Sequence, residues 1–331
     1  HIFYNGVGIH EGFGINVTFP GVTFATYQMM FAVITPLLIS GAFAERLKYS
    51  SFFIFAIAWS LFVYFPLAHW IWGGGWLAQL GVWDFAGGIV IHTSAGMASL
   101  AAGLVLGRRK NFGPQIMIPH NLPLAVIGAT MLWLGWFGFN AGSALAASGV
   151  AGNALLTSQI GASTCTLVWL FLSWKRSGKP SVAAVINGAI SGLAGITPTA
   201  GYITGESAFI LGIILGFGSY YGIVLFKEKL KIDDALDVSS VHGVTGILGA
   251  LTIGVAASPL VMENGPVGWL HGNPAQLGIQ AFGIAVAAAF AFGVSAAIFK
   301  IIDKIIGLRV SEEEEEAGLD ITQHAEKGFN D

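Results

Sequence analysis

Apolar segments about as long as a membrane is thick follow one another along the whole chain and decide its fold class. A helix that crosses a bilayer needs about 20 mostly apolar residues. We expect nine spans, at roughly 21–44, 51–72, 86–107, 121–139, 150–174, 181–198, 207–226, 237–257 and 275–302. Only 10% of the residues are charged, whereas a soluble domain has about 25%. The sequence therefore predicts an all-α polytopic membrane protein, with the lipid bilayer as its main surroundings.

The basic residues predict how this bundle lies in the membrane. If the nine spans alternate in direction, all 15 Lys and Arg residues fall on one side. By the positive-inside rule, that side is the cytoplasm. The loops on the opposite side hold no Lys or Arg and are rich in Gly and Trp. We therefore expect a multi-pass protein with a cytoplasmic C-terminus, where an acidic run, Glu312 to Glu316, belongs to a charged tail.

Two of the spans carry a histidine in matched settings. His92 follows Asp84 by eight residues, and His242 follows Asp234 by the same interval, each in a run of small residues. An ionisable side chain inside a membrane helix is costly and is a functional hypothesis by default. A matched pair suggests an internal repeat with a site between its halves.

The histidines have three interpretations. They can be satisfied core residues, or a metal pair, although two histidines with no nearby Cys or carboxylate triad make a poor zinc site. We favour a pair that shares a proton or polarises a small guest. No Lys or Arg lies deep in the spans, and carboxylates there are few. This inventory argues against an anion or divalent-metal carrier and suits a small cation or a small hydrogen-bonding molecule.

The position of each histidine along its span sets a condition on the fold. At about 1.5 Å per residue, His92 lies near the outer third of its helix and His242 near the inner third of its own. The rings can meet only if a helix start is recessed, and Gly87 and Gly88 allow an irregular entry. Asp84 is either a cation ligand or, as we prefer, a helix N-cap that shapes a vestibule.

Several function classes are excluded or disfavoured. The single cysteine, Cys165, rules out an intrachain disulfide framework. The sequence has no basic patch with interleaved aromatic residues, so we do not expect it to bind nucleic acid. No GxxxxGK[ST] run indicates an ATP site, and we expect no cofactor. The chain starts at His1 with a Gly-rich, irregular segment, so we expect a sequence whose beginning is missing.

Several motifs, in order along nearly the whole chain, resemble the ammonium transporter (Amt) family, relatives of the Rhesus glycoproteins. The motifs are FAERLKYS (43–50), HWIWGGGWL (69–77), DFAGGIVIH (84–92), GWFGFNAGSA (135–144), VHGVTGILG (241–249) and GLRVSEEEEEAGLD (307–320). The chain is more similar to the microbial Amt branch, because Trp72 and Ser143 stand where Amt proteins bind the cation.

The resemblance implies a role for each matched residue. Trp72, Phe31 and Ser143 match the outer site that recruits ammonium, where aromatic faces attract a cation and a hydroxyl accepts an N–H bond. Phe31 and Phe139 match the stacked pair of rings that blocks the pore below that site.

Four further residues match positions deeper in the pore. His92 and His242 match the twin histidines, and Trp136 matches a pore-lining tryptophan beside them. Asp84 matches the acidic residue under the recruitment site.

The resemblance also implies a function and an assembly. It implies a transporter, not an enzyme, that takes NH4+ and methylammonium, removes the proton and conducts NH3 to the cytoplasm, with or without that proton. It implies a plasma-membrane homotrimer for nitrogen uptake, with a transporter domain over 1–306. The tail, 307–331, would be regulatory and dock a PII-type signalling protein.

The family pattern has eleven spans, as two inverted five-span halves and a last helix, so the first two have no counterpart here. We expect truncation rather than a nine-span protein. Alternative functions are an ammonium sensor that signals through the tail, a membrane metalloenzyme that uses the histidines, and a Rhesus-like channel for neutral gas.

Overall fold

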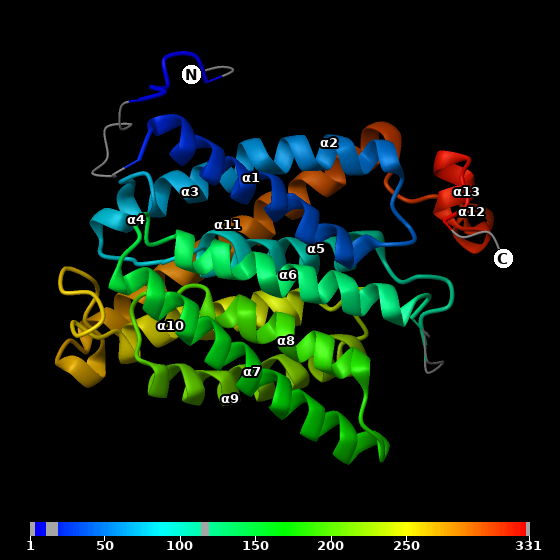
Figure 1. Cartoon of the computed structure of the whole chain (residues 1–331). Helices are drawn as coiled ribbons and strands as arrows, with labels where there is room; N and C mark the ends of the chain where they lie inside the picture. The colour runs from blue at the N-terminus through cyan, green and yellow to red at the C-terminus, as the bar shows by residue number, and fades with distance from the viewer. Residues whose placement is uncertain (1–3, 11–18, 114–118, 329–331) are drawn as a thin grey trace.

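The computed structural model describes residues 4–10, 19–113 and 119–328, which form a bundle of helices (Figure 1). The helices are α1 Gly21–Phe43, α2 Tyr49–Trp59, η2 Ser60–Tyr64, α3 Phe65–Ile71, α4 Trp76–Gln79, η3 Gly88–Thr93, α5 Ser94–Leu106, α6 Leu122–Gly142, α7 Gly149–Ser177, α8 Val182–Ile196, α9 Gly205–Ile223, η4 Val224–Lys229, η5 Ser239–Val244, α10 Thr245–Ala256, η6 Trp269–His271, α11 Ala275–Ile306, α12 Glu312–Ala317 and α13 Leu319–His324. Helix α7 packs along α8 and α9, and α11 packs along α5 and α10.

The expected spans are present, with one difference in length. In the described ranges, eight helical segments are long and apolar enough to cross a membrane. The sixth predicted span, 181–198, is the exception, because α8 has only 15 residues. It ends at Ile196, two residues before Pro198, which has no backbone N–H to continue the helical hydrogen bonds. The carbonyl of Pro198 then accepts the N–H of Phe85, so this part of the chain leaves the helix to contact the entry of another span.

The two ends of the bundle differ in composition. The loops with Lys and Arg meet at one end, which we call the basic end, where Arg109, Asp233 and Glu45 join three loops by ion pairs. The other end, which we call the tryptophan-rich end, holds the loop of Trp72 and Trp76. In Figure 1, α4 lies at the left edge of the bundle, and α12 and α13 lie at its right edge.

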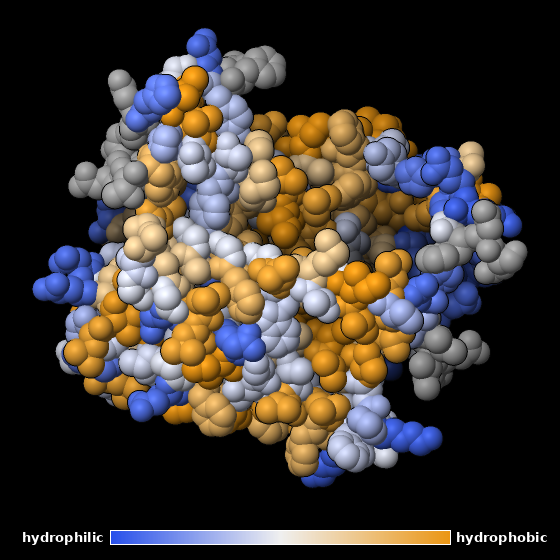
Figure 2. Space-filling model, viewed as in Figure 1, coloured by the Kyte–Doolittle hydropathy of each residue, from blue (hydrophilic) through white to orange (hydrophobic). Residues whose placement is uncertain are grey.

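The surface between these ends is mostly apolar. Figure 2 shows apolar side chains over much of the visible face, with hydrophilic groups concentrated towards its edges. Among the exposed large apolar residues are Phe62 on η2, Leu134 on α6 and Phe171 on α7. Side chains of this kind are stable at a surface that lipid covers, which agrees with a membrane-spanning bundle.

The two helices that carry the matched histidines form the centre of the bundle. Within an 18-residue apolar window of each helix, 78% of the residues are buried in the helix of His92 and 67% in the helix of His242, against 6% in α6. The two central helices cross at Gly96 and Gly243, where a Cβ on Gly96 would collide with the backbone of Gly243. Small residues at such a crossing let helix backbones approach closely, so this contact brings the two histidines towards each other.

Both central helices begin with a π-helical turn, η3 and η5, that contains the histidine. Gly87, just before η3, has a φ of +119°, a conformation that glycine adopts readily and other residues do not. The irregular entry expected at Gly87 and Gly88 is therefore present. Single π-helical turns are rare in proteins, and those that occur are often located at functional sites.

Candidate functional site

The rings of His92 and His242 meet in the middle of the bundle. Their Nδ1 atoms are 3.1 Å apart, and the ring centroids are 5.1 Å apart at 22°. Both side chains are almost fully buried. The sequence predicted a pair that meets only through a recessed helix start, and the pair meets in this way.

The Nδ1 contact decides which nitrogen atoms remain available. A hydrogen bond between two neutral imidazoles needs one Nδ1 that donates and one that accepts. The Nε2 atoms then present one acceptor and one donor. Nε2 of His92 is buried and has no hydrogen-bond partner within the described part of the chain. The pair can therefore pass a proton from one side of the contact to the other.

A cavity of about 290 Å³ lies against both histidines. Its walls include Trp136 and Phe139 from α6 and Ile34 from α1. The Trp136 ring stacks on His92 at 5.4 Å, and its Nε1 donates to Thr197 Oγ1 at 2.9 Å. The cavity is thus lined by rings and aliphatic groups, with the two imidazoles as its main polar surface.

Phe31 and Phe139 lie between this cavity and the tryptophan-rich end. Their centroids are 4.7 Å apart, and their planes make an angle of 88°. The rings therefore meet edge to face and are not stacked as the resemblance implied. The edge-to-face arrangement places the positive edge of one ring on the negative face of the other, which is favoured over a face-to-face stack.

The other members of the expected outer site lie on the far side of Phe31. The Trp72 ring is 5.9 Å from the Phe31 ring, and Trp72 Nε1 donates to the backbone carbonyl of Asp84 at 2.8 Å. Ser143 ends α6 and is 3.1 Å from the hydroxyl of Tyr27. The structure thus brings Trp72, Phe31 and Ser143 to one place.

Tyr27 is a member of this group that sequence reasoning missed. Its hydroxyl donates to the carbonyl of Phe139 at 2.8 Å and contacts Ser143, and its ring packs on Phe31 at 4.8 Å. The available signal was its position one helical turn before Phe31, on the same face of α1.

Asp84 caps the entry of η3. Its carboxylate accepts the backbone N–H groups of Gly87, Gly88, Ile89 and Val90 at 2.7 to 3.0 Å. The side chain thus caps the helix entry, but the N-cap residue is Gly87, three residues after the position predicted from the sequence. Because all four bonds hold η3 in place, Asp84 positions His92 at the end of that turn.

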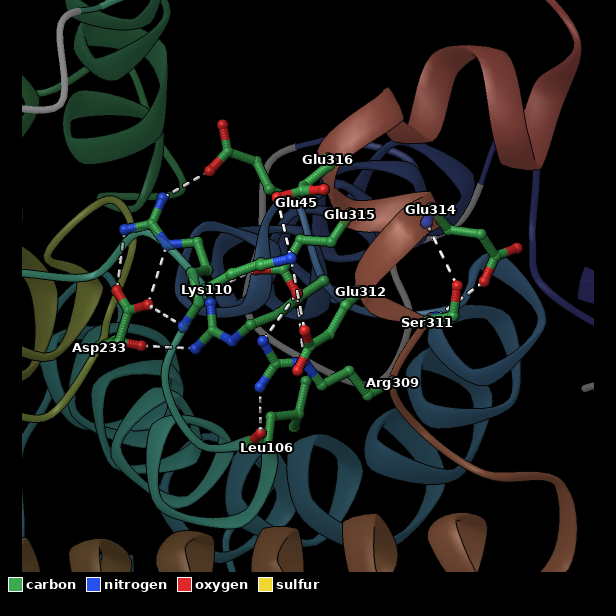
Figure 3. A network of polar contacts seen from close by, with 12 residues as sticks. Glu45, Leu106, Lys110, Asp233, Arg309, Ser311, Glu312, Glu314, Glu315 and Glu316 are labelled. Atoms are coloured by element: carbon green, nitrogen blue, oxygen red, sulfur yellow. Dashed lines mark hydrogen bonds and ion pairs between the residues drawn. The ribbon is translucent and has the colours of Figure 1, made fainter.

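The tail folds back onto the basic end (Figure 3). The acidic run forms α12, with Ser311 and Glu314 in a capping box. Lys110 pairs with Glu316 at 2.9 Å and with Glu312 at 3.4 Å. Part of the acidic run therefore binds this chain's own loop.

Arg309 fastens the same tail to a central helix. It pairs with Glu315 at 2.7 Å and donates to the carbonyl of Leu106, the last residue of α5. The tail thus contacts the helix that begins just after His92.

The model of the Ammonium Transporter Family matches residues 4–329. The chain belongs to the ammonium transporter family. Its membership agrees with the prediction of a membrane transporter that is not an enzyme.

Several proteins and solved structures are similar to this chain over most of its length. The protein named Ammonium transporter 1 of Dictyostelium discoideum is 53% identical over 94% of this chain and 68% of its own. The crystal structure of Candida albicans Mep2 has a TM-score of 0.84 at 37% identity, over 90% of this chain and 68% of that one. A solved structure named Sensor Amt Protein has a TM-score of 0.82 at 32% identity, over 92% and 77%.

Proposed function

We propose that the protein moves ammonium across the membrane along one row of rings. The row runs from Trp72 through Phe31, Phe139 and His92 to His242, with neighbouring centroids 5.9, 4.7, 6.0 and 5.1 Å apart. This continuous row is the observation that carries the proposal. It leads from the tryptophan-rich end through the most buried part of the bundle.

The outer members of the row recruit NH4+. The faces of Trp72 and Phe31 attract a compact cation through their quadrupoles, and the Ser143 hydroxyl accepts one of its N–H bonds. These contacts offset part of the cost of removing water from the ion. Asp84 is buried, and its backbone carbonyl accepts the Nε1–H of Trp72. Its carboxylate adds an attraction for positive charge at this outer site.

The ion gives up its proton at the constriction of Phe31 and Phe139, where the His92 ring stacks on Phe139, because a bare cation has no partner in the apolar cavity beyond it. The proton can bind Nε2 of His92, whose Nδ1–H then moves to Nδ1 of His242, which releases its own Nε2 proton. In this scheme one proton enters and one leaves, and both histidines change tautomer. Ammonia follows through the cavity beside them.

The experiment is a current measurement in proteoliposomes on a supported membrane, after a jump in NH4+ concentration. We expect the full chain to give a current and the His92→Ala/His242→Ala variant to lose it. His271, which lies on η6 away from the pair, supplies the matched control His271→Ala. A wild-type protein with neither current nor methylammonium uptake contradicts the proposal.

An ammonium sensor is the second candidate, favoured by the likeness to the solved structure named Sensor Amt Protein. A sensor binds ammonium without turnover. Binding of ammonium to purified protein, together with no flux in proteoliposomes, supports the sensor and not the transporter.

The same proposal includes location, assembly and partners. The basic end faces the cytoplasm of a cell whose plasma membrane holds the protein, as the placement of all 15 Lys and Arg supports. Residues 1–306 form the transporter domain and 307–331 a regulatory tail. The assembly is a homotrimer, and the tail docks a PII-type signalling protein with the carboxylates that its own loop leaves free.

A further inference from the structure

An ion pair lies at the basic end, next to the helix of His242. Nζ of Lys227, in η4, is 2.5 Å from Oδ1 of Asp237, which comes two residues before η5. The two side chains are only 28% and 16% exposed. A pair this sheltered is less screened than a surface ion pair, and neither residue has a role in the proposed row of rings.

Asp237 faces a second cavity on the same path. This inner cavity, of about 480 Å³, is lined by Asp237, Asn187 and Ser40 among mostly apolar residues. His242 lines both this cavity and the one beside the histidine pair. Ammonia that leaves the histidines at this end therefore enters a space where Asp237 is the one carboxylate among the described lining residues.

Asp237 is paired with Lys227, and its other charged neighbours have mixed signs. Burial raises the pKa of Asp237 to about 6, although the ammonium of Lys227 lowers it. The carboxylate of Asp234 raises this pKa further, and the guanidinium of Arg109 lowers it. A further cation near such a buried carboxylate stabilises its charged form.

Two polar side chains besides Asp237 and His242 line the inner cavity. The amide of Asn187 lines the inner cavity, and its oxygen can accept an N–H bond. An ammonium ion has four N–H donors. The carboxylate, this amide and the Ser40 hydroxyl, which also lines the cavity, are acceptors that suit such an ion.

We infer that Asp237 forms a binding site for ammonium at the inner end of the path, and that Lys227 is a tethered competitor for it. This inference rests on the proposed function. The lysine head group is itself a primary ammonium with one positive charge and three N–H donors. Binding is an exchange: NH4+ takes the place of Lys227 at Asp237, the lysine swings free, and its return releases the ion.

The tether sets the strength of the competition. A group held beside its site acts at an effective concentration of millimolar or more. Lys227 therefore lowers the apparent affinity of the inner site and keeps ammonium from remaining at the exit.

Chemical labelling tests the exchange without transport. The full chain is acetylated with a trace of acetic anhydride, and the ratio of Lys227 to Lys229 labelling is measured by mass spectrometry. Lys229 lies in the same helix η4 and makes no ion pair with the described residues. Added amines consume part of the acetic anhydride, but this loss lowers the labelling of both lysines equally, so the ratio does not change.

We expect methylammonium chloride to raise this ratio several-fold over sodium chloride at equal ionic strength. Tetramethylammonium chloride, whose cation has no N–H donor, leaves it unchanged. An unchanged ratio in methylammonium, or an equal rise with tetramethylammonium, overturns the inference.

Variants test the same site through flux, in vesicles of defined orientation. With ammonium added at the basic end, we expect Lys227→Gln to lower the half-saturating concentration about tenfold, as loss of a tethered competitor predicts. Lys229→Gln leaves it unchanged. Asp237→Asn raises it, and asparagine tolerates the φ of +60° at this position.

A double variant makes the test specific. In the Asp237→Asn background, Lys227→Gln has no further effect if the lysine acts only by occupying the carboxylate. Equal kinetics of Lys227→Gln and wild type overturn the inner site but leave the proposed function intact. A wild type without flux contradicts the proposed function, and the labelling ratio still decides the inner site.

Discussion

The hydroxyl of Tyr27 connects three parts of the aromatic constriction. It donates to the carbonyl of Phe139, contacts the hydroxyl of Ser143, and stands on a ring that packs against Phe31. The Ser143 hydroxyl also donates to the carbonyl of Phe139 at 2.8 Å. Tyr27 therefore fixes where the proposed acceptor of ammonium points.

Tyr27→Phe tests this positioning role. The ring stays and the hydroxyl is lost, so we expect the half-saturating concentration for ammonium at the tryptophan-rich end to rise about fivefold, from the loss of about 1 kcal/mol of hydrogen bonding. The maximal current changes little, because the histidines are untouched. Tyr221→Phe, at an exposed tyrosine of α9, serves as the control. A rise of the same size in both variants sinks the idea.

Single residues were predictable where an unusual chemical type stands in an unusual place. A histidine in an apolar span is costly and rare, so His92 and His242 were visible in the sequence, and Asp84 before a span reads as a cap. Tyr27 and Thr197 were not visible, because a tyrosine or threonine in a span has many ordinary roles. Their partners, Ser143 and Trp136, are 116 and 61 residues away, and no local pattern indicates such pairs.

Among the helices, the close crossing of the two central spans positions the histidine rings. Glycine-rich sequence predicted close packing in general but could not say which glycines meet, because that depends on the rotation of each helix. Helix boundaries agreed with the expected spans, while the π-helical turns and the short α8 were not foreseen. The entry of η3 depends on the four backbone N–H groups that the Asp84 carboxylate accepts, and α8 ends before Pro198. Neither feature can be read from the apolar pattern of the spans.

Gly96→Ala tests whether the close crossing of the two central helices positions the histidine rings. The added methyl group would collide with the backbone of Gly243, and overpacking of this kind costs typically about 1–3 kcal/mol. We expect a lower midpoint of thermal unfolding in detergent and a reduced ammonium current, since the histidine contact widens. At Gly128, on α6, a Cβ meets nothing within 4 Å. Gly128→Ala should therefore match the wild type, and a Gly96→Ala protein with unchanged midpoint and current would show that the crossing is not restrictive.

Across the whole molecule, one buried cluster at the basic end joins three loops that are far apart in the sequence. Asp233, which is fully buried, accepts two side-chain hydrogen bonds from Arg109 at 2.8 and 2.9 Å. Its backbone carbonyl accepts from buried Arg46, and Arg109 also pairs with Glu45. These contacts join the loops after α1 and α5 to the loop before η5. The sequence showed the charges on one side but not this pairing, because the partners are 124 residues apart.

Asp233→Asn should therefore destabilise the whole bundle. Breaking a buried pair leaves an uncompensated charge and costs about 3–5 kcal/mol, so we expect a clearly lower midpoint of thermal unfolding in detergent. Glu228→Gln removes a partner of Arg176 in an exposed pair at the same end, and an exposed pair is worth roughly 0–1 kcal/mol. If both variants lose the same small amount, the buried cluster does not hold the bundle together.

The pH dependence of this difference is a separate consequence. Burial alone would raise the pKa of Asp233, but its hydrogen bonds with Arg109 hold that pKa below the ordinary value. A carboxyl with a depressed folded-state pKa contributes stability that is present above its unfolded pKa, about 3.9, and is lost as pH falls through the folded value. The gap in unfolding midpoint between wild type and Asp233→Asn should stay constant from neutral pH down to about pH 5 and close only in stronger acid. A gap that closes already near pH 6 would mean that another group supplies the stability.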